Sequence, residues 1–201
     1  MTFDPAPDFN DIACSLASLA LAIEVRDAYT RGHCDRTGRI ARALGQCFDL
    51  DEDALEQLEL AAHFHDVGKI GVPDRVLLHT GPVVDEDWPS IQAHSALGER
   101  IFLASGHRHA AAVSALIRHH HEAVDGSGYP DGLAGEAIPL GARILRVADS
   151  YDAMTTRRPY AEGRPHDTAM RILHAEQDDK IDADVFRVFE RLMRDAGLRE
   201  A

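Results

Sequence analysis

Apolar residues recur at intervals of three and four along most of the chain, which is the spacing of one face of an α-helix. Residues 54–64 show this spacing, and Asp51 stands just before them, where an N-cap residue is expected. Gly68 is expected to end this helix, so that the pair His65-Asp66 lies in its last turn. Further helices are predicted at residues 11–29, 33–48, 85–103, 109–121, 142–154, 167–176 and 182–196. Since no stretch alternates as a strand would, the sequence predicts an all-α helical bundle, with Trp88 assigned to the core.

One long segment, residues 122–141, lacks helical spacing and is rich in glycine and other turn residues. A loop of roughly 20 residues inside a compact domain is either functional or disordered. Residues 1–10 contain Pro5, Pro7 and several aspartates, which predicts a disordered lead-in. Residues 11–198 are then expected to form a single domain.

Composition narrows the class of protein. The chain has 201 residues, 45 % of them hydrophobic, which is enough for one domain with a core of its own. Neither a membrane-spanning stretch nor a basic secretory leader is visible, and Cys14, Cys34 and Cys47 lack the spacing of a disulfide or metal motif, so a cytoplasmic location is expected. The net charge of −13 argues against binding to duplex nucleic acid, which needs clustered Lys and Arg.

Histidine is the unusual residue of this chain, which has twelve. A single histidine is more often structural than a ligand, but here imidazoles and carboxylates recur at or near several predicted helices, which a bundle can bring together on one interior site. The candidate metal ligands are His33, His65, Asp66, His94, His120, His121 and Asp149. Five imidazoles and two carboxylates suit two divalent ions with a bridging carboxylate, and iron, manganese or zinc fits better than copper(I).

Three motifs lie in order along the chain, and together they resemble those of the HD-GYP family, a branch of the HD phosphohydrolase superfamily. They are HDVGKIG at residues 65–71, HHEAVDGSGYP at residues 120–130, and IPLGARI at residues 138–144 continued by VADSYDAMT at residues 147–155 and by Arg158-Pro159-Tyr160. The resemblance runs from about Tyr29 to Phe189 and implies a helical bundle of the HD-domain type with a long glycine-rich loop. It implies a two-metal centre, often iron, that hydrolyses cyclic di-GMP to linear pGpG and in many members onward to GMP.

The resemblance also implies a role for each candidate ligand. His33, His65 and Asp149 would hold one ion, and His94, His120 and His121 would hold the other. Asp66 would bridge the two ions and is expected to be catalytic.

The chemistry of phosphodiester hydrolysis agrees with this assignment. The reaction needs a nucleophile at neutral pH and relief of charge on the phosphoryl oxygens, and a hydroxide that bridges two metals about 3.5–4 Å apart supplies both. Lys69 follows the His-Asp pair and is expected to contact a phosphate oxygen and steady the leaving group. Arg158 and Arg143 are candidates for pairing with the non-bridging oxygens.

Two positions depart from the family pattern, and two other functions stay open. Ala161 stands where many relatives carry a basic residue that helps hold the substrate phosphate, so this departure bears on the affinity for substrate. Tyr29 stands where some relatives place a glutamate for a third ion, so two metals are expected. One alternative is an HD phosphohydrolase acting on another nucleotide. The other is a low-turnover module that binds cyclic di-GMP or docks diguanylate cyclases through the loop Gly126–Gly135. The helix predicted at residues 11–29 is also a candidate for homodimer formation.

Overall fold

The structure is a computed structural model that describes residues 16–27, 32–79, 81–156 and 162–195. Within these residues every regular element is a helix, apart from two isolated β-bridges, which confirms the predicted all-α class. The longer helices are α1 (Leu16–Arg26), α2 (His33–Cys47), α3 (Glu52–Phe64), α5 (Trp88–Leu103), α6 (Ala110–His119), α7 (Leu140–Thr155), α8 (His166–Ala175) and α9 (Ala183–Asp195). The short elements are the 3₁₀ turns η2 (Val67–Gly71) and η3 (Gly135–Ala137) and the helix α4 (Asp74–Leu77).

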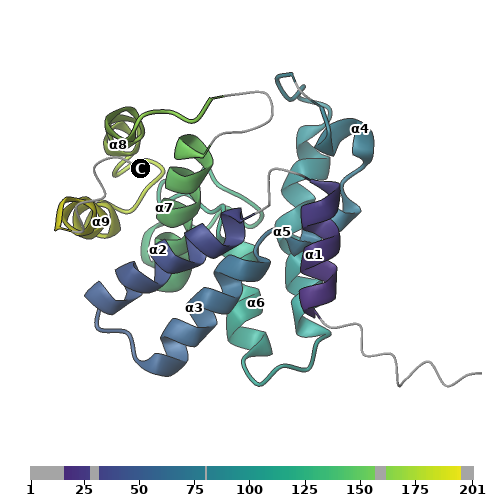
Figure 1. Cartoon of the computed structure of the whole chain (residues 1–201), viewed down its shortest axis with the longest axis horizontal. Helices are drawn as coiled ribbons and strands as arrows, with labels where there is room; N and C mark the ends of the chain where they lie inside the picture. The colour runs from purple at the N-terminus through teal and green to yellow at the C-terminus, as the bar shows by residue number, and fades with distance from the viewer. Residues whose placement is uncertain (1–15, 28–31, 80, 157–161, 196–201) are drawn as a thin grey trace, which may run out of the picture.

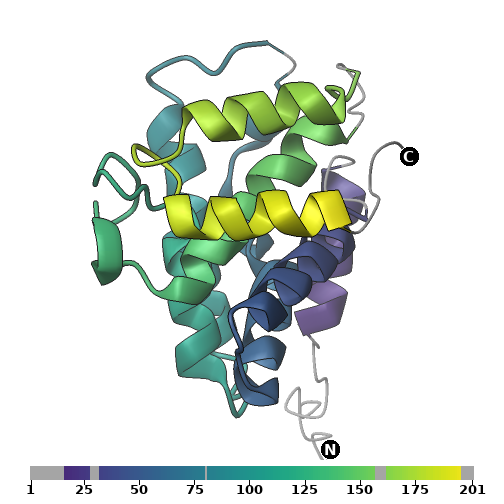
Figure 2. The ribbon, with the colours of Figure 1, turned by 90° about the vertical axis from the view of Figure 1, so that its left-hand side faces the viewer.

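The helices α2, α3, α6 and α7 form the centre of the bundle (Figure 1). On one side, α5 packs against α6 and η2, and α1 contacts η2. On the opposite side, α8 and α9 lie next to each other, and α9 packs on α2 and α7 (Figure 2). None of the helices in the described part of the chain combines the length and the apolar character that a membrane crossing requires.

The core follows from the amphipathic pattern of the helices. Leu58 of α3, Ile117 of α6, Leu145 of α7 and Phe186 of α9 are all buried in one cluster. The predicted start of α3 is confirmed, because the Asp51 carboxylate accepts a hydrogen bond of 2.8 Å from the Ala54 N–H. Each of these helices therefore turns its apolar stripe inward and its polar face to solvent.

Three details differ from the sequence prediction. The helix predicted at residues 85–103 begins at Trp88, because Pro89 has no N–H to donate and is accommodated only in a first turn. Trp88 was assigned to the core, and this is wrong, since that first helical residue is 43 % exposed. Helix α1 accounts for Leu16–Arg26 of the predicted helix at 11–29 and ends before Asp27, while residues 11–15 and 28–29 and the lead-in 1–10 lie outside the described residues.

The backbones of η2 and α5 touch at Gly68. A Cβ atom built on Gly68 would lie 1.8 Å from the carbonyl oxygen of His94 and 2.6 Å from the amide nitrogen of Gly98. Only a residue without a side chain allows this approach, since real Cβ atoms never come so close. The contact places the turn that follows α3 directly against the middle of α5.

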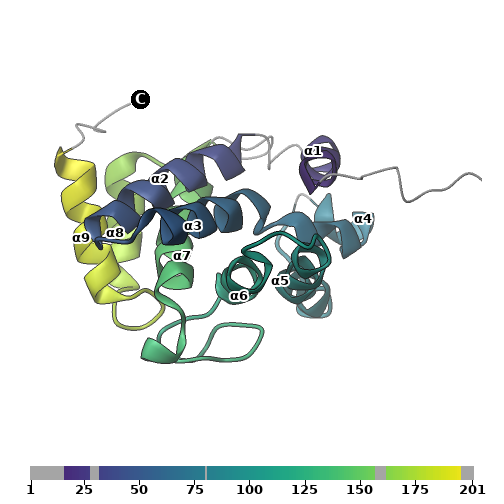
Figure 3. The same ribbon diagram turned by 90° about the horizontal axis from the view of Figure 1, so that it is seen from below.

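The glycine-rich loop between α6 and α7 is held by a buried carboxylate. Glu122 is 1 % exposed, and its two oxygens accept hydrogen bonds from the N–H groups of Asp131 (2.7 Å) and Leu133 (3.0 Å). Asp131 in turn pairs with both Arg118 and His119 at the end of α6. The loop projects below α6 and α7 in Figure 3, as an ordered structure fastened to the bundle.

Arg143 of α7 is also part of the scaffold. Its guanidinium donates to the Asp182 carboxylate at 2.5 Å and to the carbonyl oxygen of Ile138 at 3.1 Å. The other Asp182 oxygen caps the start of α9 by accepting from the N–H groups of Asp184 (2.9 Å) and Val185 (3.0 Å). Burial alone would raise the pKa of Asp182, but the Val185 N–H and Arg143 lower it below its ordinary value.

We predict that Asp182→Ala lowers the free energy of unfolding by about 1–2 kcal/mol and the melting temperature by about 2–8 °C, because α9 loses its cap and its link to α7. The stabilising effect of Asp182 should be complete above the unfolded-state pKa of about 3.9 and fall as the pH drops through the lower folded-state value. Thermal melts across pH 2.5–7 measure both effects. Asp184→Ala, which removes an exposed carboxylate paired with Arg187, is the control and should change stability by less than about 0.5 kcal/mol. Equal melting temperatures for both variants would contradict the capping role.

Candidate metal centre

All seven predicted ligands lie where helices end or pass the centre of the bundle. His65 is the C-cap residue of α3 and His120 that of α6, so the residues that follow them, Asp66 and His121, leave the helix axis at once. His33 is the first residue of α2. His94 and Asp149 belong to α5 and α7. Two consecutive residues can therefore serve one site, because the helix stops between them.

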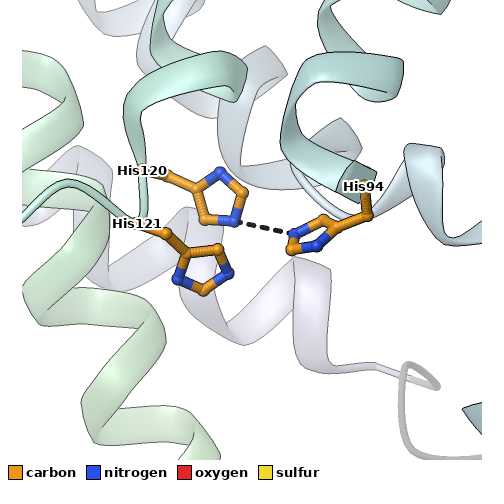
Figure 4. Close-up of side chains that lie close together, drawn as sticks. All are labelled: His94, His120 and His121. Carbon is orange, nitrogen blue, oxygen red and sulfur yellow. Dashed lines mark hydrogen bonds between the residues drawn. The ribbon is translucent and has the colours of Figure 1, made fainter. Parts of the chain in front are cut away.

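The ligand atoms form two groups. In each of the sets His33, His65, Asp66 and His94, His120, His121, the three donor atoms lie within 4.8 Å of one another. Asp149 joins the first set, since its Oδ1 lies 3.1 Å from His33 Nε2 and 3.7 Å from His65 Nε2. In the second set, Nε2 of His94 and Nε2 of His120 are 3.4 Å apart (Figure 4).

Asp66 lies between the two groups. Its Oδ2 is 3.5 Å from His65 Nε2, and its Oδ1 is 3.6 Å from His94 Nε2. Ligands about 2.0–2.2 Å from one ion are about 3.0–3.6 Å from each other, so these separations fit donor atoms around metal ions. The structure thus brings together the seven residues proposed from the sequence and puts the expected bridging carboxylate in the middle.

Backbone carbonyl groups set the orientation of three imidazole rings. The Nδ1–H groups of His65, His94 and His120 donate to the carbonyl oxygens of Ala62 (2.8 Å), Ile91 (2.6 Å) and Ile117 (2.6 Å), each three residues earlier in the chain. A neutral imidazole that donates through Nδ1 keeps a lone pair on Nε2. The 3.4 Å contact in Figure 4 therefore joins two acceptors, an arrangement that a divalent cation between them would stabilise.

The second group is neutral at physiological pH. Burial, followed by the neighbouring imidazoles, lowers the pKa of His120 well below its ordinary value. Burial likewise lowers the pKa of His94, and it lowers that of His121 to about 3. Neutral imidazole is the form that binds metal, so these three residues need not lose a proton first.

The first group carries balanced charges. Burial alone would raise the pKa of Asp66 and Asp149, but Lys69 for the former and His33 for the latter hold it below the ordinary range. Burial would lower the pKa of His33, but its hydrogen bonds to Asp149 and Asp152 raise it to about 9. The carboxylates of Asp66 and Asp149 are therefore ionised and available as ligands at neutral pH.

Asp152 is a candidate supporting residue that the sequence analysis missed. Its Oδ2 accepts a 2.6 Å hydrogen bond from His33 Nδ1, and its Oδ1 accepts one of 2.6 Å from Arg36. A carboxylate behind a histidine ligand fixes the ring and increases its basicity. The signal in the sequence is the spacing, because Asp149 and Asp152 are three residues apart and so share one face of α7.

The two groups open onto a cavity of about 590 Å³. Its lining includes residues of both groups together with Lys69, Asp27 and Tyr129, and it also includes apolar residues such as Val76 and Leu78. The Lys69 ammonium lies 2.7 Å from Asp66 Oδ2 and 3.9 Å from Asp27. Arg26 of α1 donates to the carbonyl oxygens of Lys69 (2.9 Å) and Ile70 (3.1 Å), which fixes the backbone that carries this lysine.

The predicted substrate-binding residues, Lys69, Arg143 and Arg158, differ in where they lie relative to the cavity. Lys69 lines the cavity, as expected from its place beside the ligands. Arg143 does not line the cavity, and its guanidinium is bound by Asp182 instead. Arg158, Ala161 and Tyr29 lie outside the described residues.

With this geometry established, comparison with known proteins defines the class. A family model described as an HD domain matches residues 18–185, and the chain therefore belongs to the HD domain family. Two solved structures share the fold: a cyclic GMP-AMP specific phosphodiesterase of Vibrio cholerae (TM-score 0.65, 22 % identity, 91 % of this chain and 51 % of that chain) and an HDG"Y"P protein of Bdellovibrio bacteriovorus (TM-score 0.66, 19 % identity, 92 % and 60 %).

Sequence relatives confirm the relationship to HD-GYP phosphodiesterases. The cyclic di-GMP phosphodiesterase response regulator RpfG of Xanthomonas campestris is 40 % identical over 81 % of this chain, and a cyclic di-GMP phosphodiesterase of Thermotoga maritima is 34 % identical over 90 %. The 3'3'-cGAMP-specific phosphodiesterase 3 of Vibrio cholerae is 30 % identical, also over 90 %. The chain spans 43 %, 49 % and 39 % of these three proteins, so it corresponds to less than half of each.

We predict that Asp152→Asn weakens metal binding by about 10–100-fold, because His33 loses the carboxylate that orients it and raises its basicity. Titration with Mn²⁺, with circular dichroism as a check on the fold, measures the effect. Arg36→Gln is the matched control, since it removes the other partner of Asp152 and leaves the bond to His33 in place. An affinity unchanged by Asp152→Asn would contradict the supporting role.

Metal binding should also release a proton. His33, with a pKa of about 9, must become neutral to bind an ion, whereas the His94 group already is. Below pH 9 we therefore expect release of about one proton per loaded chain and an affinity that rises about tenfold per pH unit. Calorimetry with Mn²⁺ in two buffers of different ionisation enthalpy counts the protons. Zero release at pH 7 would rule out His33 as the titrating ligand.

Proposed function

We propose that this chain is a metal-dependent phosphodiesterase domain that hydrolyses cyclic di-GMP to pGpG or onward to GMP. The observation that carries the proposal is the arrangement of two ligand groups around Asp66, in the lining of a cavity that Lys69 also lines. Relatives named as cyclic di-GMP phosphodiesterases, which match most of this chain, support the choice of substrate.

The ligands would be divided as the sequence motifs imply. His33, His65 and Asp149 would hold one divalent ion, His94, His120 and His121 the other, and Asp66 would be shared. Such a pair of ions supplies a nucleophile at neutral pH and relief of negative charge on the phosphoryl oxygens. The backbone carbonyl groups behind His65, His94 and His120, and Asp152 behind His33, keep the rings in place for this task.

Lys69 would act on the substrate itself. Burial lowers its pKa, but Asp66 raises it above the ordinary value, so the ammonium stays charged. From its position in the cavity wall it would contact a phosphoryl oxygen and stabilise the charge that develops there. Arg158 is proposed as a second phosphate contact.

We propose iron as the metal, with manganese or zinc as alternatives. The donor set of five imidazoles and two carboxylates has no thiolate, which argues against copper(I). Cys34 is next to His33 in the chain, but its thiol is buried, and burial raises its pKa, so it is not a ligand.

Two further parts of the proposal concern the surroundings of the domain. The loop Gly126–Gly135 is proposed as a docking surface for diguanylate cyclases. A cytoplasmic location is also proposed, and the proposed substrate and the free thiols Cys34 and Cys47 support it. A second candidate substrate is 3'3'-cGAMP, because a relative specific for it is 30 % identical over most of this chain.

The deciding experiment combines elemental analysis of anaerobically prepared protein with chromatography of its products from cyclic di-GMP and from 3'3'-cGAMP. We expect about two ions per chain, pGpG or GMP as product, and a faster reaction with cyclic di-GMP. Asp66→Asn should lose turnover and metal but keep the helical circular dichroism. Asp27→Asn is the control, because this carboxylate lines the same cavity outside both ligand groups and should keep the metal.

Each result has a definite meaning. Metal without hydrolysis of either cyclic dinucleotide would contradict the proposed activity. Full turnover by Asp66→Asn would contradict the bridging role.

A further inference from the structure

Trp88 has an unusual position for the single tryptophan of the chain. It is the first residue of α5, its surface is 43 % exposed, and it lines the same cavity as the ligand groups. Leu78, which lines the same cavity, is 51 % exposed. Large apolar side chains that face a cavity, rather than the core, commonly mark a binding surface.

Helix α5 carries both apolar residues of the cavity lining and one of the candidate metal ligands. Trp88, Ile91 and His94 are three residues apart in turn, so they lie along one face of the helix, and all three line the cavity. A rise of 1.5 Å per residue puts Trp88 about 9 Å from His94 along the helix axis. The same helix therefore presents a candidate metal ligand at one position and an aromatic ring less than two turns earlier.

The proposed hydrolysis does not account for the apolar residues that line the cavity, such as Leu78, Trp88 and Ile91. In the proposed reaction, the bound metal ions and Lys69 contact the phosphodiester, which is the charged part of a cyclic dinucleotide. The remaining parts of that substrate with a large flat surface are its two purine bases, and bases stack on aromatic side chains.

We propose that Trp88, which lines the cavity together with Leu78 and Ile91, is the surface on which a nucleobase of the substrate stacks while the phosphodiester lies at the His94 end of α5. This inference rests on the proposed function and adds a residue that determines affinity. Stacking uses the π-face that every base has, so this contact does not separate guanine from adenine. Discrimination between cyclic di-GMP and 3'3'-cGAMP must then come from other contacts.

The kinetic test compares Trp88→Ala, Trp88→Phe and the control Val84→Ala. Val84 is an exposed apolar residue (55 %) of the segment before α5 that does not line the cavity. Trp88→Ala should raise KM by about 10–100-fold, by the same factor for cyclic di-GMP and 3'3'-cGAMP, with kcat changed less than about threefold. Trp88→Phe should recover most of the affinity, and Val84→Ala should behave as the unchanged chain. An unaltered KM in Trp88→Ala, or an equal rise in Val84→Ala, overturns the proposal.

A fluorescence test keeps this inference separate from the proposed activity. Because Trp88 is the only tryptophan, its emission reports on this position alone. We expect GMP to quench it saturably and ribose 5-phosphate, which has the phosphate but no base, to leave it unchanged. This holds even if no cyclic dinucleotide is hydrolysed, so failure of the activity and failure of the stacking surface are distinguishable. Equal quenching by both compounds, or none by GMP, overturns the inference.

Discussion

The contact between Gly68 and α5 is the constraint on which the ligand arrangement depends. A side chain at this position would meet the His94 carbonyl oxygen, so only glycine lets η2 lie flat against the helix. The approach puts the His65-Asp66 turn beside His94, and Asp66 consequently faces both groups of imidazoles, with oxygens 3.5 and 3.6 Å from His65 and His94. A short stretch of backbone packing thus decides whether there is one shared centre or two separate clusters.

The helical fold was largely predictable because long amphipathic helices leave a repeating pattern in the sequence. The capped helix α3 is the clearest case, with the Asp51 cap found where the pattern required it. The four-residue helix α4 and the five-residue turn η2 are too short for any periodicity to appear. The exposure of Trp88 could not be inferred either, since the sequence does not reveal which helix ends line a cavity.

The residues that form the two candidate ligand groups were predictable from residue type and motif, but the residues around them were not. Lys69 lies next to Asp66 because the two are three residues apart in one turn. Asp152 acts on His33 over 119 positions of sequence, and Asp182 binds Arg143 over 39. A basic residue near a motif resembles a phosphate contact until its partner is known, and for Arg143 only the folded chain identifies that partner.

The buried carboxylate of Glu122 affects how the glycine-rich loop meets other molecules. Because two backbone N–H groups of the loop are bound to Glu122, the loop has its shape in the isolated chain. The partner proposed for this loop would lose little conformational entropy in ordering it. Its association would then be governed by the orientation of two preformed surfaces, and changes at the loop tip would act mainly on the lifetime of the complex rather than on its rate of formation.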